Sequence, residues 1–133
     1  QFHDHVSIPI VPALIRARAH LDAIGAESVS LIVTGGLRTA PDFVKALALG
    51  ADAVCITSSA VTAAGESSDL ARAAQRLTNF CQASTELMKM AARACGHSHL
   101  SQFNLEDLTT FDDQLHKLTG ISWAGGKLGA PVV

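Results

Sequence analysis

The chain has 133 residues, of which 48% are hydrophobic and 17% charged, so it holds enough apolar material for one packed domain and is not typical of a disordered segment. Its formal net charge is −2, its pI is about 6.3, and it has no Lys/Arg-rich run, which argues against nucleic acid or an anionic membrane surface as partners. No apolar stretch reaches the roughly 20 residues that a membrane-spanning helix needs, so we expect no membrane segment.

The cysteines argue for a reducing compartment. There are three, Cys55, Cys81 and Cys95, and each lies in a stretch with the pattern of a strand or helix. An odd number in such contexts favours buried, reduced thiols over a disulfide framework. No signal-peptide pattern opens the chain, and we therefore expect a cytoplasmic protein. The chain starts at Gln1 rather than Met, which is compatible with a piece of a longer protein.

The first predicted element is a helix that follows a proline-punctuated loop. It is expected to begin near Pro12, because a proline is tolerated in the first turn, and to end before Gly25. Apolar residues recur at helical spacing and should face a sheet; they are Leu14, Ala17, Leu21 and Ile24. In the loop, His3 and His5 flank Asp4 and could serve as metal ligands or general bases, although a solvated loop cluster is the commoner outcome for such a short pattern.

The next stretch predicts a parallel β–α–β unit. A β-branched apolar run, Ser30–Thr34, ends in a glycine pair, and a second apolar run, Val54–Thr57, follows a helix-compatible stretch. That helix should be capped by Thr39, carry Pro41 in its first turn and end at Gly50. Because both strands are continuously apolar, we expect them to be buried on both faces, as in an all-parallel sheet.

The carboxyl ends of these two strands carry the candidate binding residues. Ligands of parallel α/β folds sit at that end of the sheet, where Gly35 and Gly36 follow the first strand, and Thr57 and Ser58 follow the second. A glycine pair leaves backbone N–H groups bare, and such groups can hold a phosphate. The alternative, that the glycines only make a tight turn, stays open. No residue stands out as catalytic.

The carboxyl-terminal half has a different, helical character. A long amphipathic helix is predicted over Asp69–Cys95 and ended by Gly96. Its stripe contains Leu70, Ala73, Leu77, Phe80, Ser84, Leu87, Ala91 and Ala94. Two short helices, Asn104–Leu108 and Thr110–Leu118, should follow, and Ala124–Gly129 is expected to be mobile.

Three residues near the end of the long helix are of the types that bind soft metal ions. Cys95, His97 and His99 alternate along the chain, but a fourth ligand is not evident. Capping or packing roles are the alternative, and we expect no metal.

Several sequence words resemble the end of the FMN-binding synthase domain of the glutamate synthase family. The resemblance spans nearly the whole chain and lies in Asp4–Val6 with Ile8-Pro9, Val29–Thr39, Lys45–Val54, Ala92–Leu100 and Asn104–Leu108. It implies a (β/α)8 barrel in which the strand before Gly35 is the seventh and the Val54 strand the eighth. A full barrel needs about 250 residues, so the chain would hold only the last quarter.

The resemblance also implies a domain plan, a cofactor and a reaction. Residues 1–65 would be the end of the barrel, 66–123 a helical segment packed on it, and 124–133 a flexible tail. The family uses FMN to reduce an imine formed from 2-oxoglutarate and ammonia, which yields glutamate. The FMN phosphate lies at the ends of the last two strands, which implies Gly35, Gly36, Thr57 and Ser58 as cofactor-binding residues.

Two departures from the family pattern affect the cofactors. The family usually has Ile-Gly-Thr after the eighth strand, whereas this chain has Ile56-Thr57-Ser58, so a side chain stands where phosphate would approach the backbone. FMN is therefore expected to bind weakly or not at all to the isolated chain. The family's cysteine-rich segment is replaced by Gly65–Asp69, and no iron–sulfur cluster is expected.

Two kinds of function follow. The chain is either the terminal fragment of a glutamate synthase-like oxidoreductase, inactive by itself, or a non-catalytic remnant that serves as an interaction module. In both cases two strands are too few to stand alone, so we expect a homo-oligomer or a partner chain that supplies the rest of the barrel.

Overall fold

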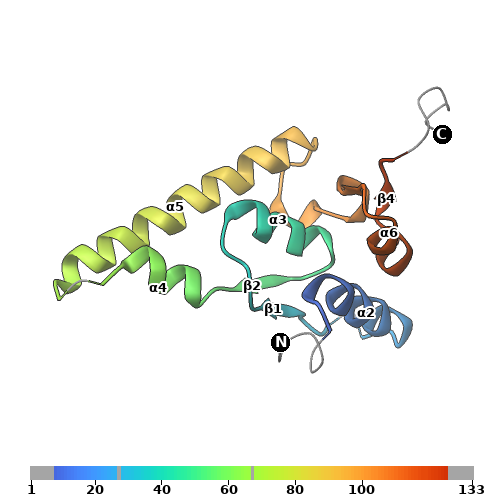
Figure 1. Cartoon of the computed structure of the whole chain (residues 1–133), viewed down its shortest axis with the longest axis horizontal. Coiled ribbons are helices and arrows are strands. Elements are labelled where there is room, and N and C mark those ends of the chain that lie inside the picture. The colour runs from blue at the N-terminus through green and yellow to red at the C-terminus, as the bar shows by residue number, and fades with distance from the viewer. Residues whose placement is uncertain (1–7, 27, 67, 126–133) are drawn as a thin grey trace.

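The computed structural model describes residues 8–26, 28–66 and 68–125. It is an α/β arrangement with two small parallel sheets, and the described residues form no closed barrel (Figure 1). The elements in chain order are α2 (Ile10–Ala23), β1 (Ile32–Thr34), α3 (Ala40–Ala48), β2 (Ala53–Cys55), α4 (Ser58–Ala64), α5 (Leu70–Ala94), the 3-10 turns η1 (Leu100–Gln102) and η2 (Leu105–Asp107), β3 (Thr109–Thr110), α6 (Asp113–Thr119) and β4 (Ser122–Trp123).

The predicted β–α–β unit is confirmed. Strands β1 and β2 are parallel, with Ile32 opposite Ala53 and Thr34 opposite Cys55, and α3 forms the crossover between them. Both strands are shorter than predicted, because β1 begins at Ile32 and β2 ends at Cys55. Thr57 therefore does not lie in the strand but precedes α4, a helix that the sequence reading missed.

The sheet is covered on one face only, so the burial on both faces that is expected of a complete parallel sheet is not reached by these two strands. Val33 points into the core and is 7% exposed, whereas its neighbour Ile32 is 62% exposed. Thr34 and Cys55, which are paired across the sheet, are also exposed. Side chains alternate along a strand, so these residues form one bare face that no described part of the chain covers.

Two small cores hold the elements together. The first joins α2, β1, α3 and the segment after α6, and its buried members are Leu14, Val33, Ala46, Leu49, Ala51 and Ile121. The second joins α3, α5 and the turns that follow α5, through Ala48, Ala92 and Phe103. Helix α3 is thus the element that both cores share.

Helix α2 begins two residues earlier than predicted. Pro12 lies in its first turn, where the missing N–H costs nothing, and Ala13 donates its N–H to the carbonyl of Pro9 at 3.1 Å. Leu14 is buried as expected. Ile24 is 60% exposed, so its assignment to the packed face was wrong: it caps the helix instead of continuing it.

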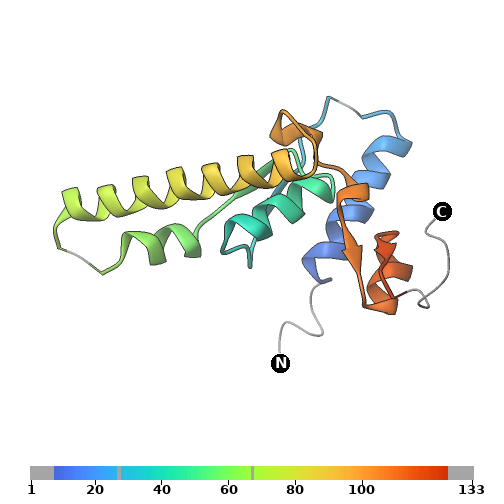
Figure 2. The same cartoon turned by 90° about the horizontal axis from the view of Figure 1, so that it is seen from above.

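The long helix α5 is confirmed almost to the residue. Asp69 accepts hydrogen bonds from the N–H groups of Ala71 and Arg72, and Cys95 caps the other end. Figure 2 shows α5 side by side with α4, as an arm that extends from the rest of the molecule. Leu70 and Leu87 of the predicted apolar stripe are 82% and 53% exposed, because nothing in the described chain covers that part of the helix.

The carboxyl-terminal region contains a second parallel strand pair that the sequence did not predict. Thr109–Thr110 pairs with Ser122–Trp123, and the helix predicted from Thr110 begins only at Asp113. The predicted short turn of helix at Leu105–Asp107 is confirmed, with Asn104 as its cap. Ala124 donates its N–H to the carbonyl of Thr110 at 2.8 Å, while the rest of the expected mobile tail lies outside the described residues.

All three cysteines are free and exposed, so the expectation of buried thiols was wrong. Cys55 lies on the bare face of the sheet, and Cys95 lies at the end of α5. For Cys55 the reason is that no described part of the chain covers this face of the sheet. None of the described helices has both the length and the apolar character needed to cross a membrane.

Candidate functional site

The carboxyl ends of β1 and β2 form one rim. Because Thr34 pairs with Cys55, the glycine pair after β1 and the segment Ile56–Ser58 after β2 leave the sheet from the same edge (Figure 1). The four candidate residues therefore share the rim that the sequence predicts. Among the described residues no hydrogen bond joins the two segments directly.

The glycine pair adopts a backbone that other residues rarely take. Gly35 has φ of 102° and Gly36 has φ of 72°, both in the left-handed region. A Cβ built at either position would meet no atom within 4 Å, so the glycines are required by backbone conformation and not by crowding. The turn consequently leaves open space beside its backbone.

Asp42 fixes this turn to the start of α3. Its Oδ2 accepts the N–H of Arg38 at 3.0 Å, the N–H of Thr39 at 2.9 Å and the hydroxyl of Thr39 at 2.9 Å. The hydrogen bond from the Arg38 backbone and then that from Thr39 lower the pKa of Asp42 below its ordinary value, so the carboxylate is charged at neutral pH. The capping box that positions the helix thus also holds the loop after the glycines.

The second half of the rim is rich in hydroxyl groups. Thr57 is the N-cap of α4 with φ of −122°, a conformation that needs no glycine, and Ser58 is the first residue of the helix; both are exposed. Ser59 is 7% exposed, and its Oγ is the one buried side-chain polar atom without a hydrogen-bond partner among the described residues. A buried unpaired hydroxyl is costly, which makes Ser59 a candidate ligand-binding residue that the sequence reading missed.

A cavity of about 300 Å³ lies beside the glycine turn. It is mostly apolar, but Gly36, Asp42 and Lys45 contribute polar groups to its lining. From the sequence, Lys45 is expected only to form part of a helix. Its position one turn after Asp42 in α3 could have indicated that it faces the same side of the helix.

The amino ends of the strands are held by a separate network. Arg18 of α2 donates from Nε to the carbonyl of Gly50 at 2.9 Å and from a terminal nitrogen to Asp52 Oδ2 at 2.6 Å. The same Asp52 oxygen accepts the N–H of Leu31 at 2.7 Å. This network ties α2 to the edge of the sheet opposite the rim, so its role is structural.

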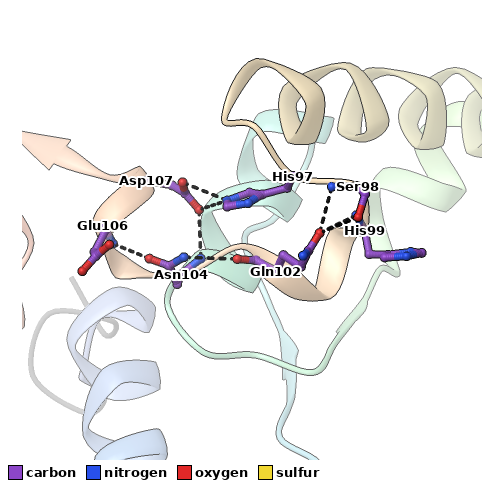
Figure 3. A network of polar contacts seen from close by, with 7 residues as sticks. All are labelled: His97, Ser98, His99, Gln102, Asn104, Glu106 and Asp107. Atoms are coloured by element: carbon purple, nitrogen blue, oxygen red, sulfur yellow. Dashed lines mark hydrogen bonds and ion pairs between the residues drawn. The ribbon is translucent and has the colours of Figure 1, made fainter.

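The histidines near the end of α5 have packing and hydrogen-bonding roles. His97 Nε2 lies 2.8 and 3.0 Å from the two carboxylate oxygens of Asp107, and its ring stacks edge-on against Phe103 (Figure 3). His99 is the N-cap residue of η1. No group of three potential metal ligands occurs in residues 8–26, 28–66 and 68–125, and His3 and His5 lie outside that part of the chain.

A family model described as a conserved region in glutamate synthase matches residues 1–70 of the chain. The matched region contains the β–α–β unit, the whole rim and α4, and it ends where α5 begins. No solved structure matches the chain significantly.

Individual relatives agree with the family match. A glutamate synthase large subunit-like protein of Rhizobium meliloti is 28% identical over 172 aligned residues, which cover 95% of this chain. An archaeal glutamate synthase (NADPH) of Methanocaldococcus jannaschii is 45% identical over 65 residues, and an archaeal-type glutamate synthase (NADPH) of Thermotoga neapolitana is 44% identical over 63 residues. These two matches cover 48% and 47% of this chain.

The chain is much shorter than these relatives. It spans 39% of the Rhizobium protein and 13% and 12% of the other two. The alignment with the Rhizobium protein is also longer than this chain, so that relative contains residues with no counterpart here.

Proposed function

Since this chain belongs to the glutamate synthase family, we propose that it is the carboxyl-terminal part of an FMN-dependent glutamate synthase-type barrel and supplies the phosphate end of the FMN site. The observation that carries this proposal is the rim, where a left-handed glycine turn after one parallel strand and a short hydroxyl-rich helix after the next follow the same end of the sheet. In (β/α)8 barrels, phosphate sites are frequently formed by the loops after the last two strands and by a short extra helix. The position of α4 agrees with that pattern.

The one-sided sheet supports a partial barrel. Ile32 is 62% exposed on a face that a closed barrel would turn inward, and each of the two strands has an open edge where a further strand would pair. On this proposal residues 1–65 end the barrel, 66–123 form a helical segment packed on it, and 124–133 form a tail.

The residues of the rim fit a phosphate better than a complete flavin. Gly35 and Gly36 leave backbone and space free, and the Ser59 hydroxyl needs a partner. Thr57 is the unfavourable element, because its side chain stands beside the place where the phosphate would lie. Weak or absent FMN binding by the isolated chain therefore remains our prediction.

In the complete enzyme, FMN would supply the electrons that reduce an imine made from 2-oxoglutarate and ammonia. The part proposed for this chain is to bind and orient. Backbone N–H groups of Gly35 and Gly36 and the hydroxyls of Ser58 and Ser59 would donate hydrogen bonds to the phosphate. Lys45 would add positive charge beside the turn. No residue of this chain is assigned to proton transfer. We propose the cytoplasm as its compartment.

Complementation tests the proposal. The chain is co-expressed with the part of the Methanocaldococcus relative that precedes the matched region. The absorbance of the purified complex measures how much flavin it retains. Comparing FMN with riboflavin, which lacks the phosphate, shows whether binding of the flavin requires that phosphate. We expect a complex that retains FMN but not riboflavin. Gly36→Val should abolish retention, because the side chain enters the left-handed turn.

The matched control is Gly25→Val, which also places a side chain at positive φ, 68°, but lies at the end of α2 away from the rim. This variant should retain FMN. The proposal fails if the complex forms without flavin, or if Gly36→Val binds FMN as well as the control does.

The second candidate function is a non-catalytic interaction module. It is favoured by the bare sheet face together with exposed apolar residues on the arm, such as Val61 at 68% and Leu70 at 82% exposure. If the chain self-associates and forms no complex with the co-expressed strands, the result would favour this alternative over the first candidate function.

A further inference from the structure

A second candidate site lies at the far end of α5, outside the rim. A cavity of about 500 Å³ is bounded there by the last two turns of α5 and by the loop that follows it. The floor is apolar and includes Ala92, which is 3% exposed, and Leu100. Its polar lining consists of Lys89, Arg93, His97, Ser98 and His99.

The charge of this cavity is unusual for the chain. The protein carries a net charge of −2, yet two of its ten cationic side chains and two of its six histidines line this one cavity. Glu86 is the carboxylate close to the cationic side chains, and Lys89 pairs with it at 2.9 Å. Arg93 makes no hydrogen bond or ion pair with another residue of the described chain, but the hydrogen bond from Lys89 and then the charges of Lys89 and Arg93 lower the pKa of Glu86. The two cations thus share one nearby carboxylate, which leaves an excess of positive charge at the cavity.

The loop that carries the histidines is held rigidly. Gln102 Oε1 accepts hydrogen bonds from the N–H and the hydroxyl of Ser98 and from the N–H of His99, at 2.8, 3.0 and 2.9 Å. His97 is anchored by Asp107 on the other side (Figure 3). Figure 3 shows the ring of His99 pointing away from both Gln102 and Asp107. The loop side of the lining is therefore held in place before any ligand arrives, which lowers the entropy cost of binding.

We propose that this cavity binds the phosphate group of a small phosphorylated molecule, with Arg93 and Lys89 as the charged contacts and His99 as an additional donor. An arginine presents paired N–H donors that suit phosphate oxygens, and a lysine adds a compact charge. A concave cavity with an apolar floor fits a small molecule better than an extended peptide, because a small molecule can be largely enclosed.

A structural alternative exists for the two cations. Positive side chains near the carboxyl end of a helix interact favourably with its dipole, so Lys89 and Arg93 could serve α5 alone. The last carbonyls of α5 already accept N–H groups from Cys95, Gly96 and His97, which reduces the negative field that an anion would meet. Phosphate-dependent behaviour separates the two roles.

The test is a ³¹P NMR titration of inorganic phosphate against the full chain at constant ionic strength. We expect saturable line broadening, weakened about threefold or more in Arg93→Gln and in Lys89→Gln, each of which removes one charged contact. The matched control, Arg72→Gln, removes an exposed arginine of α5 that does not line the cavity and should bind as the parent chain does. Equal broadening in all three variants, or none in the parent, overturns the proposal.

Two further arms make the result specific. Gly36→Val disables the proposed FMN phosphate site at the rim. If phosphate binds in the cavity at the end of α5, its binding must persist in Gly36→Val and weaken in Arg93→Gln. If phosphate binding is lost only in Gly36→Val, the phosphate binds at the rim and the second site is refuted. Glycerol phosphate and a phosphoserine tripeptide are titrated in parallel. We expect glycerol phosphate to bind at least as tightly, and a clear preference for the peptide would overturn the assignment to a small molecule.

Discussion

At the scale of single residues, Arg18 is the side chain that most directly ties a helix to the sheet. It bridges α2 to the carbonyl of Gly50 and to Asp52, and its stem lies against the Gly50 backbone. Gly50 has φ of 99°, and a Cβ at this position would come within 2.7 Å of Arg18 Cγ. Glycine is thus needed there for both conformation and space.

A pair of glycine variants separates these two needs. In Gly25→Ala the new Cβ meets no atom within 4 Å. The free energy of unfolding should therefore fall only by the cost of holding an alanine in the left-handed region, about 1 kcal/mol. In Gly50→Ala the free energy of unfolding should fall by about 1–2 kcal/mol more, because the new Cβ displaces Arg18 and breaks its hydrogen bonds. Urea denaturation followed by circular dichroism measures both; equal losses would mean that Arg18 contributes little to stability.

The rim also shows how a residue can be named from sequence while its neighbour cannot. The Gly35–Gly36 turn was predictable, because a glycine pair directly after an apolar run indicates positive φ. Ser59 gave no such signal: its importance rests on being buried without a partner, and no pattern of neighbouring residues records that burial. Thr57, which departs from the family pattern, adopts an ordinary backbone conformation.

At the scale of elements, the pair His97–Asp107 joins the end of α5 to η2. The two side chains are only 17% and 13% exposed, and Asp107 also accepts the N–H of Asn104 at 2.9 Å. The hydrogen bond from the Asn104 backbone and then that from His97 lower the pKa of Asp107. Burial of Phe103 beneath the His97 ring makes this the anchor of the second core.

The sign of the resulting pH dependence follows from the lowered pKa. The folded state prefers the charged Asp107, so this stabilisation is present above the ordinary aspartate pKa and is lost as the pH falls through the lower folded value. Asp107→Asn should cost about 1–3 kcal/mol at neutral pH and should flatten the loss of unfolding free energy below about pH 4. Chemical denaturation at several pH values measures both effects.

Glu106→Gln is the matched control for this prediction. It neutralises the adjacent carboxylate, which is exposed and whose side chain has no ion pair within the described part of the chain. Its stability and pH profile should stay close to those of the parent. If Asp107→Asn behaves in the same way as this control, the His97–Asp107 contact does not anchor the end of α5.

At the scale of the whole molecule, the dominant feature is a sheet that lacks a second layer. Two short parallel strands are poorly supported alone, and their bare face exposes Ile32 beside Ala53. Another copy of the chain, or the strands of a complete barrel, would remove this apolar surface from water. Self-association of the isolated chain is therefore our prediction.

Sedimentation velocity at tens of micromolar tests this prediction. We expect species larger than a monomer, and we expect Ile32→Thr to weaken association while it keeps a β-branched residue in β1. Val61→Thr is the control, since Val61 is similarly exposed, at 68%, but lies on the arm. A compact monomer, or equal effects of the two variants, would show that the sheet face is not the contact.

The sequence alone determined the local organisation of this protein. The bounds of α5, the caps at Thr39, Asp69 and Asn104, and the parallel β–α–β order follow from patterns within a few residues of each other, where hydrogen-bond and backbone preferences act directly. The family resemblance belongs to this class too, since it depends on the order of residues. Short sequence motifs, such as the one around the glycine turn, can be recognised whether or not the rest of the barrel is present.

Only the tertiary structure decided which of these surfaces are covered. Apolar strands predict burial, but Ile32 and Cys55 are exposed because burial requires a second layer, and no local pattern records whether that layer belongs to the same chain. The unpaired Ser59 hydroxyl, the strand pair Thr109–Thr110 with Ser122–Trp123, and the basic cavity at the end of α5 likewise arise from contacts between segments distant in sequence. Such contacts depend on the summed packing of many residues.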